Sequence, residues 1–401
     1  MLDYSQPARL DRRGRPGPVL ELGPLLRRVD WTLMIAVGAL VAYGLWILDG
    51  VTANDVSGDP NYYVARQATY AAVGTAGFLV ALFVDPDHYR RGRTVTYGLM
   101  VATLLVVLVA GVEVRGSTRW LELGGFRFQP SEFGKLLLVV FLAGFLADRG
   151  KRAGESRTTL AAVGFALVPA VLVFVQPDVG SALVYGAALG AVLFLAGARW
   201  LQLAWLAAGV AAVAVFVLWG GPAMGVELLK PYQVERLTAF YNPSQDPGGA
   251  TYNVNQSQIA VGAGGVTGRG PSGATQTNLD YLPEHATDFV FASLAEQRGF
   301  VGASILLALY LLVVWRALNT VAVARDAFSA IVAGGIAVAL LFQIVVNVGM
   351  TIGMAPVTGI PLPFVSAGGS SLITNLVAMG ILQAIHARGR AASHPIRIRR
   401  A

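Results

Sequence analysis

The sequence is poor in the residues that most soluble proteins use at their surfaces and in their metal sites. It has no cysteine, and Asp, Glu, Lys and Arg together make up only 13% of its 401 residues. A disulfide, a thiolate nucleophile and a cysteine-ligated metal are therefore excluded. A soluble domain is not expected either, since about 25% of its residues would be charged. The histidines are too few and too scattered for a zinc-type cluster: His88, His285, His386 and His394.

What fills the sequence instead is apolar. Hydrophobic residues make up 55% of the chain, and the mean hydropathy is +0.59. Several apolar runs reach the roughly 20 residues that an α-helix needs to cross a bilayer. The boundary at Pro177 divides one long run in two, because proline disfavours helix for the residue before it. We therefore predict an all-α polytopic membrane protein with ten transmembrane helices, at residues 30–49, 67–84, 92–113, 131–148, 158–175, 179–196, 200–220, 289–315, 327–352 and 366–387.

The distribution of positive charge predicts which way the helices cross. Cytoplasmic loops collect Lys and Arg, and most of the 30 Lys and Arg residues fall on one side if both termini are cytoplasmic. The basic tail 1–28 lacks the apolar run of a cleavable signal peptide, and a second basic tail, 389–401, follows the membrane domain 29–388. The net charge of +7 is thus expected to serve topology and contact with anionic lipid, not nucleic-acid binding.

One loop, residues 221–288, is far longer than the others and is predicted to be extracytoplasmic, between the seventh and eighth helices. Its segment "ELLKPYQVERLTAFYNP" (227–243) suggests a short amphipathic helix, and a glycine-rich segment follows. No strand precedes the glycines and no Lys-Ser or Lys-Thr follows them, which argues against a phosphate-binding loop. We expect the glycines to supply positive φ and close backbone contact in a packed re-entrant loop.

Polar residues recur where the predicted helices meet the outer face. Glu132 and Lys135 lie one turn apart at the start of the fourth helix. Asp178 follows Gln-Pro at the start of the sixth, and Ser370 lies in "GGSS" at the start of the last. Structural alternatives are a helix-start ion pair for the first two, a helix cap for Asp178 and small-residue packing for Ser370. All four are candidate substrate-binding residues because they share a place at the outer helix ends, and three of them are ionisable groups, which are costly at membrane depth and tend to be functional.

Asp288 is the candidate catalytic residue. It ends the long loop immediately before the apolar "FVFASLA", at the predicted outer headgroup level. A half-buried carboxylate has a raised pKa, which suits a general base acting on a sugar hydroxyl; a helix N-cap is the alternative. The same stretch supplies Glu284 and His285 as expected loop supports, and Glu296 and Arg298 as an expected ion pair about two turns into the helix.

Five ordered blocks resemble the signatures of the SEDS family, which comprises RodA, FtsW and the sporulation homologues. They are "GFRFQPSEFGKLLLVVFLA", "QPDVGSAL", "DPGGATYNVNQSQIAVGAGGVTGRG", "YLPEHATDFVFASLAEQRGFVG" and "MAPVTGIPLPFVSAGGSSLITN". The resemblance covers residues 30–387, and "ATQTNLDYLPE" is closer to the elongation branch, RodA, than to the division branch.

The resemblance implies a ten-helix fold and a peptidoglycan glycosyltransferase. Such enzymes join lipid II into glycan strands on the outer leaflet, together with a class B penicillin-binding protein and, in the elongation branch, other elongation-complex proteins. The resemblance implies that Asp288 is the essential catalytic acid, and that Glu132 and Lys135 are the charged residues of the Q-P-S-E-x-x-K block. Family members commonly have "HTDF", whereas this chain has "HATDF", which puts a family role for His285 in doubt.

These residues suggest a mechanism. Asp288 would deprotonate the acceptor 4-hydroxyl, and the donor α-linkage would be inverted to β. Lys135, paired with Glu132, would orient the site or bind the leaving pyrophosphate, with Arg119 and Arg236 as further phosphate contacts. No metal cage is readable in the sequence, although a divalent cation, Mg²⁺ or Mn²⁺, bound by carboxylates and pyrophosphate is compatible with it.

Three alternatives stay open from the sequence. A lipid II flippase would need polar residues along the whole bundle, particularly in its inner half. A division-branch, FtsW-like polymerase would share the chemistry but not the cellular role. A non-catalytic scaffold would predict that Asp288→Asn leaves polymerisation intact. The gathering of polar residues at the outer helix ends favours the glycosyltransferase.

Overall fold

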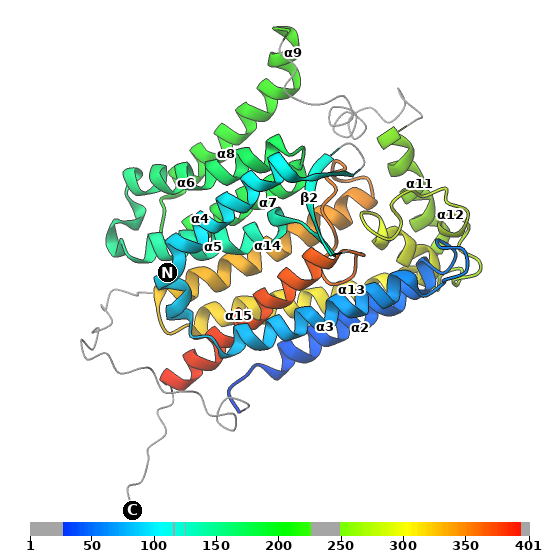
Figure 1. Cartoon of the computed structure of the whole chain (residues 1–401), viewed down its shortest axis with the longest axis horizontal. Helices are drawn as coiled ribbons and strands as arrows, with labels where there is room; N and C mark the ends of the chain where they lie inside the picture. Colours follow the sequence, from blue (N-terminus) through cyan, green and yellow to red (C-terminus); the bar gives the residue numbers. More distant parts are fainter. Residues whose placement is uncertain (1–26, 115–116, 125, 226–248, 394–401) are drawn as a thin grey trace, which may run out of the picture.

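The computed structural model describes residues 27–114, 117–124, 126–225 and 249–393, and all ten predicted long helices are present in it. They pack side by side in one bundle (Figure 1). The ten are α2 (Trp31–Val51), α3 (Tyr62–Phe83), α4 (Pro86–Ala110), α5 (Pro130–Ala147), α6 (Ser156–Val175), α7 (Val179–Leu195), α8 (Trp200–Val215), α13 (Val290–Val323), α14 (Ala327–Thr351) and α15 (Gly369–Ser393).

Length and composition support a membrane-spanning bundle. Eight of these helices are long and apolar enough to cross a membrane, α8 being counted there with its continuation to Ala223. Of the other two, α7 is apolar but has 17 residues, and α3 carries Arg66 and Gln67 in its first turns. The all-α polytopic class is therefore confirmed. Which face of the membrane each end meets stays a prediction from the positive charge.

The boundary predicted at Pro177 is confirmed, because α6 ends at Val175 and α7 starts at Val179. Asp178 is the N-cap of α7, and its side chain accepts a hydrogen bond from the Ser181 N–H. Pro130 occupies the first turn of α5, as predicted, where its missing N–H costs nothing. Both helices thus follow a Gln-Pro pair, but Pro130 lies inside α5 whereas Pro177 precedes the Asp178 cap of α7.

Several helix boundaries were predicted wrongly: α3 and α4 begin at Tyr62 and Pro86, before the predicted starts at 67 and 92. The eighth helix was expected to stop at residue 315, but α13 continues to Val323, and α15 continues to Ser393, into the predicted tail 389–401. A further difference is a break inside α13 at Gly299, where φ is +65°. The prediction stopped before Arg316, where the apolar run ends, but a helix can continue through the polar residues that follow.

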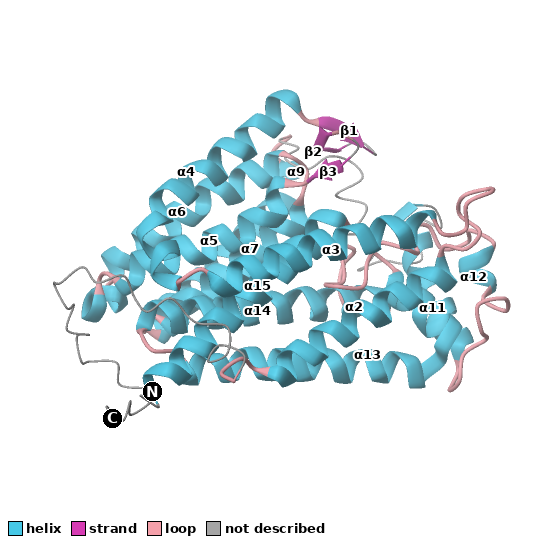
Figure 2. Cartoon of the chain, turned by 60° about the horizontal axis from the view of Figure 1, so that its bottom comes forward, coloured by secondary structure: helices cyan, strands magenta, loops and turns pink. Residues whose placement is uncertain are grey.

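A small antiparallel sheet between α4 and α5 was not predicted. It consists of β1 (Val112–Val114), β2 (Ser117–Leu123) and β3 (Phe126–Phe128), paired in the order β1-β2-β3. Figure 2 shows it beside the end of α4, and its strands also contact α5 and α15. The segment alternates apolar and polar residues over only a few positions, a weak strand signal beside the long apolar runs.

The long loop is largely folded where the structure describes it. A π-helical turn (Phe216–Gly220) and α9 (Gly221–Ala223) prolong α8, and α11 (Gly249–Gly264) and α12 (Thr275–Asn278) precede α13. Figures 1 and 2 place α11 and α12 at the end of the bundle opposite the start of α2 and the end of α15. The predicted helix in 227–243, the candidate Arg236 and most of the two tails lie outside the described residues.

The predicted role of the glycine-rich segment is confirmed at Gly268, which packs against Gly299 at the break in α13. Both have positive φ, and a Cβ on Gly268 would lie 2.2 Å from the Gln297 carbonyl oxygen. Backbone N–H groups of Arg269 and Gly270 donate to the carbonyls of Glu296 and Gln297. The glycine segment therefore satisfies the carbonyls that the break in α13 leaves without helical partners.

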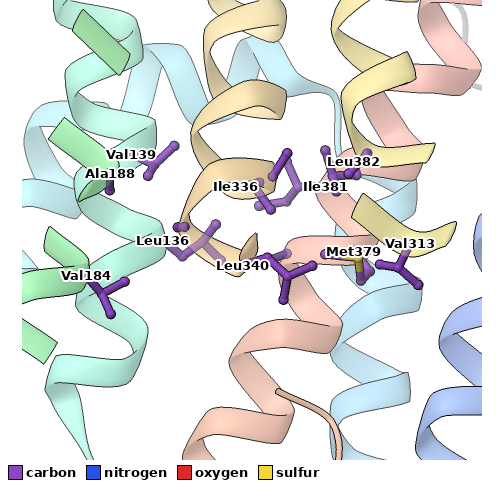
Figure 3. Packing of buried hydrophobic residues seen from close by; sticks show 14 of the residues in the cluster. Leu136, Val139, Val184, Ala188, Val313, Ile336, Leu340, Met379, Ile381 and Leu382 are labelled. Atoms are coloured by element: carbon purple, nitrogen blue, oxygen red, sulfur yellow. The ribbon is translucent and has the colours of Figure 1, made fainter. Parts of the chain in front are cut away.

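Buried residues of α5, α14 and α15 pack together in the core (Figure 3). Leu136 and Val139 of α5 lie near Ile336 of α14, and all three are buried. Small residues permit the close approach: a Cβ on Gly335 would come within 2.7 Å of Val139. In a membrane, such van der Waals packing replaces much of the hydrophobic drive. At the other extreme, the described part of α8 buries none of its span.

Candidate active site

The Asp288 loop, residues 282–289, is held by hydrogen bonds from other elements to its backbone. The Asn347 side-chain amide on α14 donates to the Asp288 carbonyl at 2.9 Å. The Ser366 hydroxyl donates to the Thr287 carbonyl at 2.5 Å, and the Ala367 N–H donates to the Ala286 carbonyl at 2.9 Å. Three successive carbonyls are thus fixed, which positions the half-buried side chain of Asp288 before any substrate binds.

Glu284 supports the same loop from within, as predicted. Its backbone has φ of +57°, and its carbonyl accepts from the N–H groups of Thr287 and Phe289. The Thr287 hydroxyl also donates to Glu284 Oε2 at 2.8 Å. The N-cap residue of α13 is Phe289. The alternative that Asp288 is the N-cap is therefore wrong.

Glu132 and Lys135 form the predicted ion pair, deep in the bundle. Lys135 Nζ lies 2.7 Å from Glu132 Oε1, and the two residues are 6% and 2% exposed. Lys135 Nζ also donates to Gln343 Oε1 on α14 at 3.1 Å. Glu132 Oε2 is buried and has no hydrogen-bond partner among the described residues. A buried carboxylate oxygen without a partner is costly, and a cation or a hydrogen-bond donor would satisfy it.

One face of α14 connects this ion pair to the Asp288 loop. Gln343 and Asn347 are one helical turn apart; the first accepts from Lys135 and the second donates to the Asp288 and Ile360 carbonyls. Asn347 is fully buried, and its Oδ1 has no partner among the described residues. Neither residue was predicted, although two amides four residues apart in an apolar span are a readable signal of function.

A second polar cluster surrounds Asp178. Its Oδ2 accepts from the Gln129 side chain and the Ser131 hydroxyl, both at 3.0 Å, and Arg119 Nη1 lies 3.6 Å from its Oδ1. The Ser370 hydroxyl accepts from the Gln129 N–H at 2.9 Å and donates to a carbonyl of β3. The cluster therefore joins the starts of α5, α7 and α15 to the sheet.

The structure gives the second cluster a supporting role, and for Asp178 this role is the helix cap that the sequence offered as an alternative. Asp178 caps α7 and neutralises Arg119, and Ser370 bonds neighbouring backbone. Arg119 Nε, however, is buried without a partner among the described residues, and the side chain is 22% exposed. Substrate binding by Arg119, Asp178 and Ser370 stays a prediction.

The ion pair expected between Glu296 and Arg298 is not formed, and that prediction is wrong. The Glu296 carboxylate is fully buried and accepts from the backbone N–H groups of Gln276 and Thr277 at the start of α12. Arg298 instead lies over the Trp46 ring, 3.8 Å from its centroid. The two side chains diverge because residues two apart on a helix do not face each other.

His285 connects the Asp288 loop to the chain between α2 and α3. Its Nδ1 lies 3.2 Å from the Leu282 carbonyl oxygen, and its Nε2 lies 3.0 and 3.1 Å from the two Asp55 oxygens. Burial alone would lower the pKa of His285. The hydrogen bond to Asp55 and its negative charge outweigh this, and they hold the pKa above its usual value. The predicted structural role of His285 in the loop fits these contacts.

Comparison with known proteins identifies the family. The family model of FtsW, RodA and SpoVE, described as cell cycle protein, matches residues 27–391. The chain belongs to this family. It is similar to the peptidoglycan glycosyltransferase MrdB of Escherichia coli K12, with 35% identity over 92% of this chain and 96% of that protein.

Two further relatives are similar over nearly their whole length. The probable peptidoglycan glycosyltransferase FtsW of Thioalkalivibrio sulfidiphilus is 37% identical over 94% of both chains. Among solved structures, a chain from a peptidoglycan synthase complex that coordinates polymerisation and crosslinking has a TM-score of 0.76 and 31% identity, covering 90% of this chain and 98% of that one. With its apolar helices, the chain is a multi-pass protein of the bacterial cytoplasmic membrane.

Proposed function

We propose that this protein is a peptidoglycan glycosyltransferase that polymerises lipid II into glycan strands at the outer leaflet of the cytoplasmic membrane. The observation that carries the proposal is the whole-length similarity to a peptidoglycan glycosyltransferase in a chain whose Asp288 loop is fixed by the bundle. Elongation is the proposed cellular role, from the "ATQTNLDYLPE" segment; identities of 35% and 37% to MrdB and FtsW are too close to separate the branches.

In the proposed reaction, Asp288 acts as general base. Its carboxylate takes the proton of the acceptor 4-hydroxyl, and the oxygen attacks the anomeric carbon of the donor. The bond from that carbon to the pyrophosphate oxygen breaks, and the undecaprenyl pyrophosphate leaves with the electron pair, so the α-linkage becomes β. General base catalysis of this type contributes about 10²- to 10⁴-fold.

The departing pyrophosphate needs positive charge nearby. Lys135 is the buried candidate, held by Glu132 and Gln343, and Arg119 is a second one at the sheet. The free Glu132 Oε2 fits a divalent cation, Mg²⁺ or Mn²⁺, because such ions prefer carboxylate oxygen. When bound, the cation would offset the negative charge of the leaving group.

The proposed partner is a class B penicillin-binding protein, which would crosslink the strands that this chain makes, within a larger elongation complex. Its support is the similarity to a chain of a peptidoglycan synthase complex that coordinates polymerisation and crosslinking. Lipid II as substrate follows from the glycosyltransferase activity named for the relatives.

The test is glycan-strand formation from labelled lipid II by the purified full-length protein with its transpeptidase. Wild type is expected to make polymer, and Asp288→Asn is expected to lose it by at least about a hundredfold. Glu122→Gln, which alters an exposed carboxylate on β2, is the matched control and should keep full activity. A protein that moves lipid II across vesicles but makes no polymer would be a flippase, and polymer at the wild-type level from Asp288→Asn would identify a scaffold.

A further inference from the structure

Three side chains that the proposed reaction does not use meet at the edge of the α11–α12 region. Asp55 comes from the connection between α2 and α3, and Asp280 and His285 come from the segment between α12 and α13. One ligand atom from each lies within 4.8 Å of the other two. Segments more than 200 residues apart in the sequence thus bring one imidazole and two carboxylates together.

The orientation of the imidazole shows what the group lacks. His285 Nδ1 faces the Leu282 carbonyl oxygen at 3.2 Å, and a carbonyl only accepts, so this nitrogen carries a hydrogen. In neutral histidine the other nitrogen, Nε2, is then a lone pair, and it points at both oxygens of Asp55. An acceptor that faces two acceptors is unfavourable unless a positive species lies among them.

Charge and spacing favour a metal ion in this position. A proton on His285 offsets one of the two carboxylate charges, whereas a divalent cation offsets both. Ligand atoms about 2.1 Å from a shared metal lie roughly 3 Å apart when they subtend a right angle, which is the spacing from Nε2 to Asp55. The Nδ1 hydrogen bond to a backbone carbonyl is also the arrangement that fixes metal-binding histidines.

We propose that Asp55, Asp280 and His285 form a binding site for a divalent transition-metal ion, with Zn²⁺ and Mn²⁺ as the ions that suit it. One imidazole nitrogen with two carboxylate oxygens fits these ions, while Mg²⁺ and Ca²⁺ prefer oxygen alone. The side chains of His285 and Asp55 are 11% and 15% exposed, so water can complete the coordination and an ion can enter.

Bound metal would tie the α2–α3 connection to the loop in which Asp288 follows His285 by three residues. The sequence excluded a zinc-type cluster only because its four histidines are few and scattered, and it did not take carboxylate ligands into account. Here the carboxylates of Asp55 and Asp280 supply the other ligands. Asp280 lies five residues before His285 in the same loop, whereas Asp55 is 230 residues away in sequence. The site stands whether or not Asp288 is the base; only its effect on that loop depends on the proposed function.

The test uses untagged full-length protein in detergent, stripped with EDTA, dialysed and titrated with Zn²⁺ or Mn²⁺ by calorimetry, without lipid II. Wild type should bind one ion per chain, and Asp55→Asn, Asp280→Asn and His285→Gln should each weaken binding at least tenfold. Asp59→Asn, on the same connection, is the control and should bind as wild type does. His285→Cys should keep Zn²⁺ binding, because a thiolate is a good zinc ligand.

Two further measurements separate lost binding from lost folding. The melting temperature of each variant in EDTA should equal that of EDTA-stripped wild type. Zn²⁺ should raise the melting temperature of wild type and of Asp59→Asn, and should raise that of His285→Gln only slightly or not at all. In electron paramagnetic resonance, bound Mn²⁺ should show a coupling to the His285 nitrogen, and His285→Gln should remove this coupling. Absence of saturable binding by wild type, or unchanged affinity in all three ligand variants, would overturn the proposal.

Discussion

The two ends of the helix bundle differ in how they hold most of their charges, although Asp30 at the start of α2 is also buried, with Arg316 as its partner. At the end where α2 begins and α15 finishes, acids near the surface pair with more than one arginine: Asp85 contacts Arg325 and Arg388 at 3.1 and 3.3 Å, and Asp148 contacts Arg90 and Arg93. These pairs are part exposed, so water can replace a lost partner.

At the Asp288 end, by contrast, polar groups are buried in the bundle and several lack a complete set of partners. Glu132 Oε2 and Asn347 Oδ1 are examples among the described residues. Such groups weaken a fold unless something binds to them. The comparison teaches that one end is arranged for stability and lipid contact and the other for chemistry, and the following substitutions should separate the two.

The largest effect is expected from Lys135→Met. It removes the partner of a buried carboxylate, and breaking such a pair costs about 3–5 kcal/mol, so the free energy of unfolding in detergent should fall by that amount. Adding Glu132→Gln should restore much of it, because the remaining groups are then neutral. Equal thermal stability of Lys135→Met and wild type would show that the pair is not buried as described.

Next in size is Gly299→Ala at the break in α13. With φ +65° and ψ −164°, Gly299 lies in a backbone region that only glycine adopts readily, so strain there costs another residue about 1–3 kcal/mol. A Cβ would also lie 2.3 Å from the Gly268 nitrogen. Thermal unfolding should therefore show a loss of at least about 2 kcal/mol. Gly209→Ala, on exposed α8 with nothing within 4 Å of the new atom, is the control and should not destabilise. A neutral Gly299→Ala would contradict the packing of the glycine segment.

A smaller loss of stability, with a larger effect on activity, is expected from Asn347→Ala. It removes the hydrogen bonds to the Asp288 and Ile360 carbonyls, which costs about 1–3 kcal/mol. Misplacement of Asp288 should lower kcat for lipid II polymerisation about tenfold or more, with a smaller change in KM. A change in KM alone would mean that α14 binds substrate without positioning the loop.

The smallest effect is expected at the opposite end, from Asp85→Asn. Burial raises the pKa of Asp85, but the Asp87 N–H and the charges of Arg325 and Arg388 outweigh it and lower the pKa below its usual value. Because the pKa is lowered in the fold, the charged Asp85 carboxylate contributes its full stabilisation at any pH above its usual pKa. This stabilisation is lost as the pH falls through the lowered pKa of the folded protein. Asp85→Asn should therefore cost at most about 1 kcal/mol at neutral pH and flatten the loss of stability below about pH 4. A loss comparable to that of Lys135→Met would erase the contrast between the ends.

The sequence predicted most of the fold and the Glu132–Lys135 pair because both depend on residues that are close together in the chain. Apolar runs determine membrane helices almost by themselves, so all ten were found, and Pro177 and Asp178 marked a break that local chemistry dictates. The Glu132–Lys135 pair was predictable because one turn of a helix brings residues three apart together.

What the sequence did not reveal depends on contacts between distant segments. The roles of Asn347 and Gln343 became visible only when α14 was placed beside the Asp288 loop and α5. The meeting of Asp55 with His285 joins positions 230 residues apart. Glu296 shows the same limit: a nearby arginine suggested a local partner, whereas the fold uses that carboxylate to cap α12.

The central claim is that the Asp288 carboxylate is the base at the buried polar end of the bundle. The most direct measurement is the initial rate of lipid II polymerisation by Asp288→Asn and Asp288→Glu beside wild type, with matched melting temperatures. We predict that Asp288→Asn is at least about a hundredfold slower than wild type, and that Asp288→Glu, which keeps a displaced carboxylate, lies between the two. An Asp288→Asn rate within a factor of a few of wild type would contradict the account.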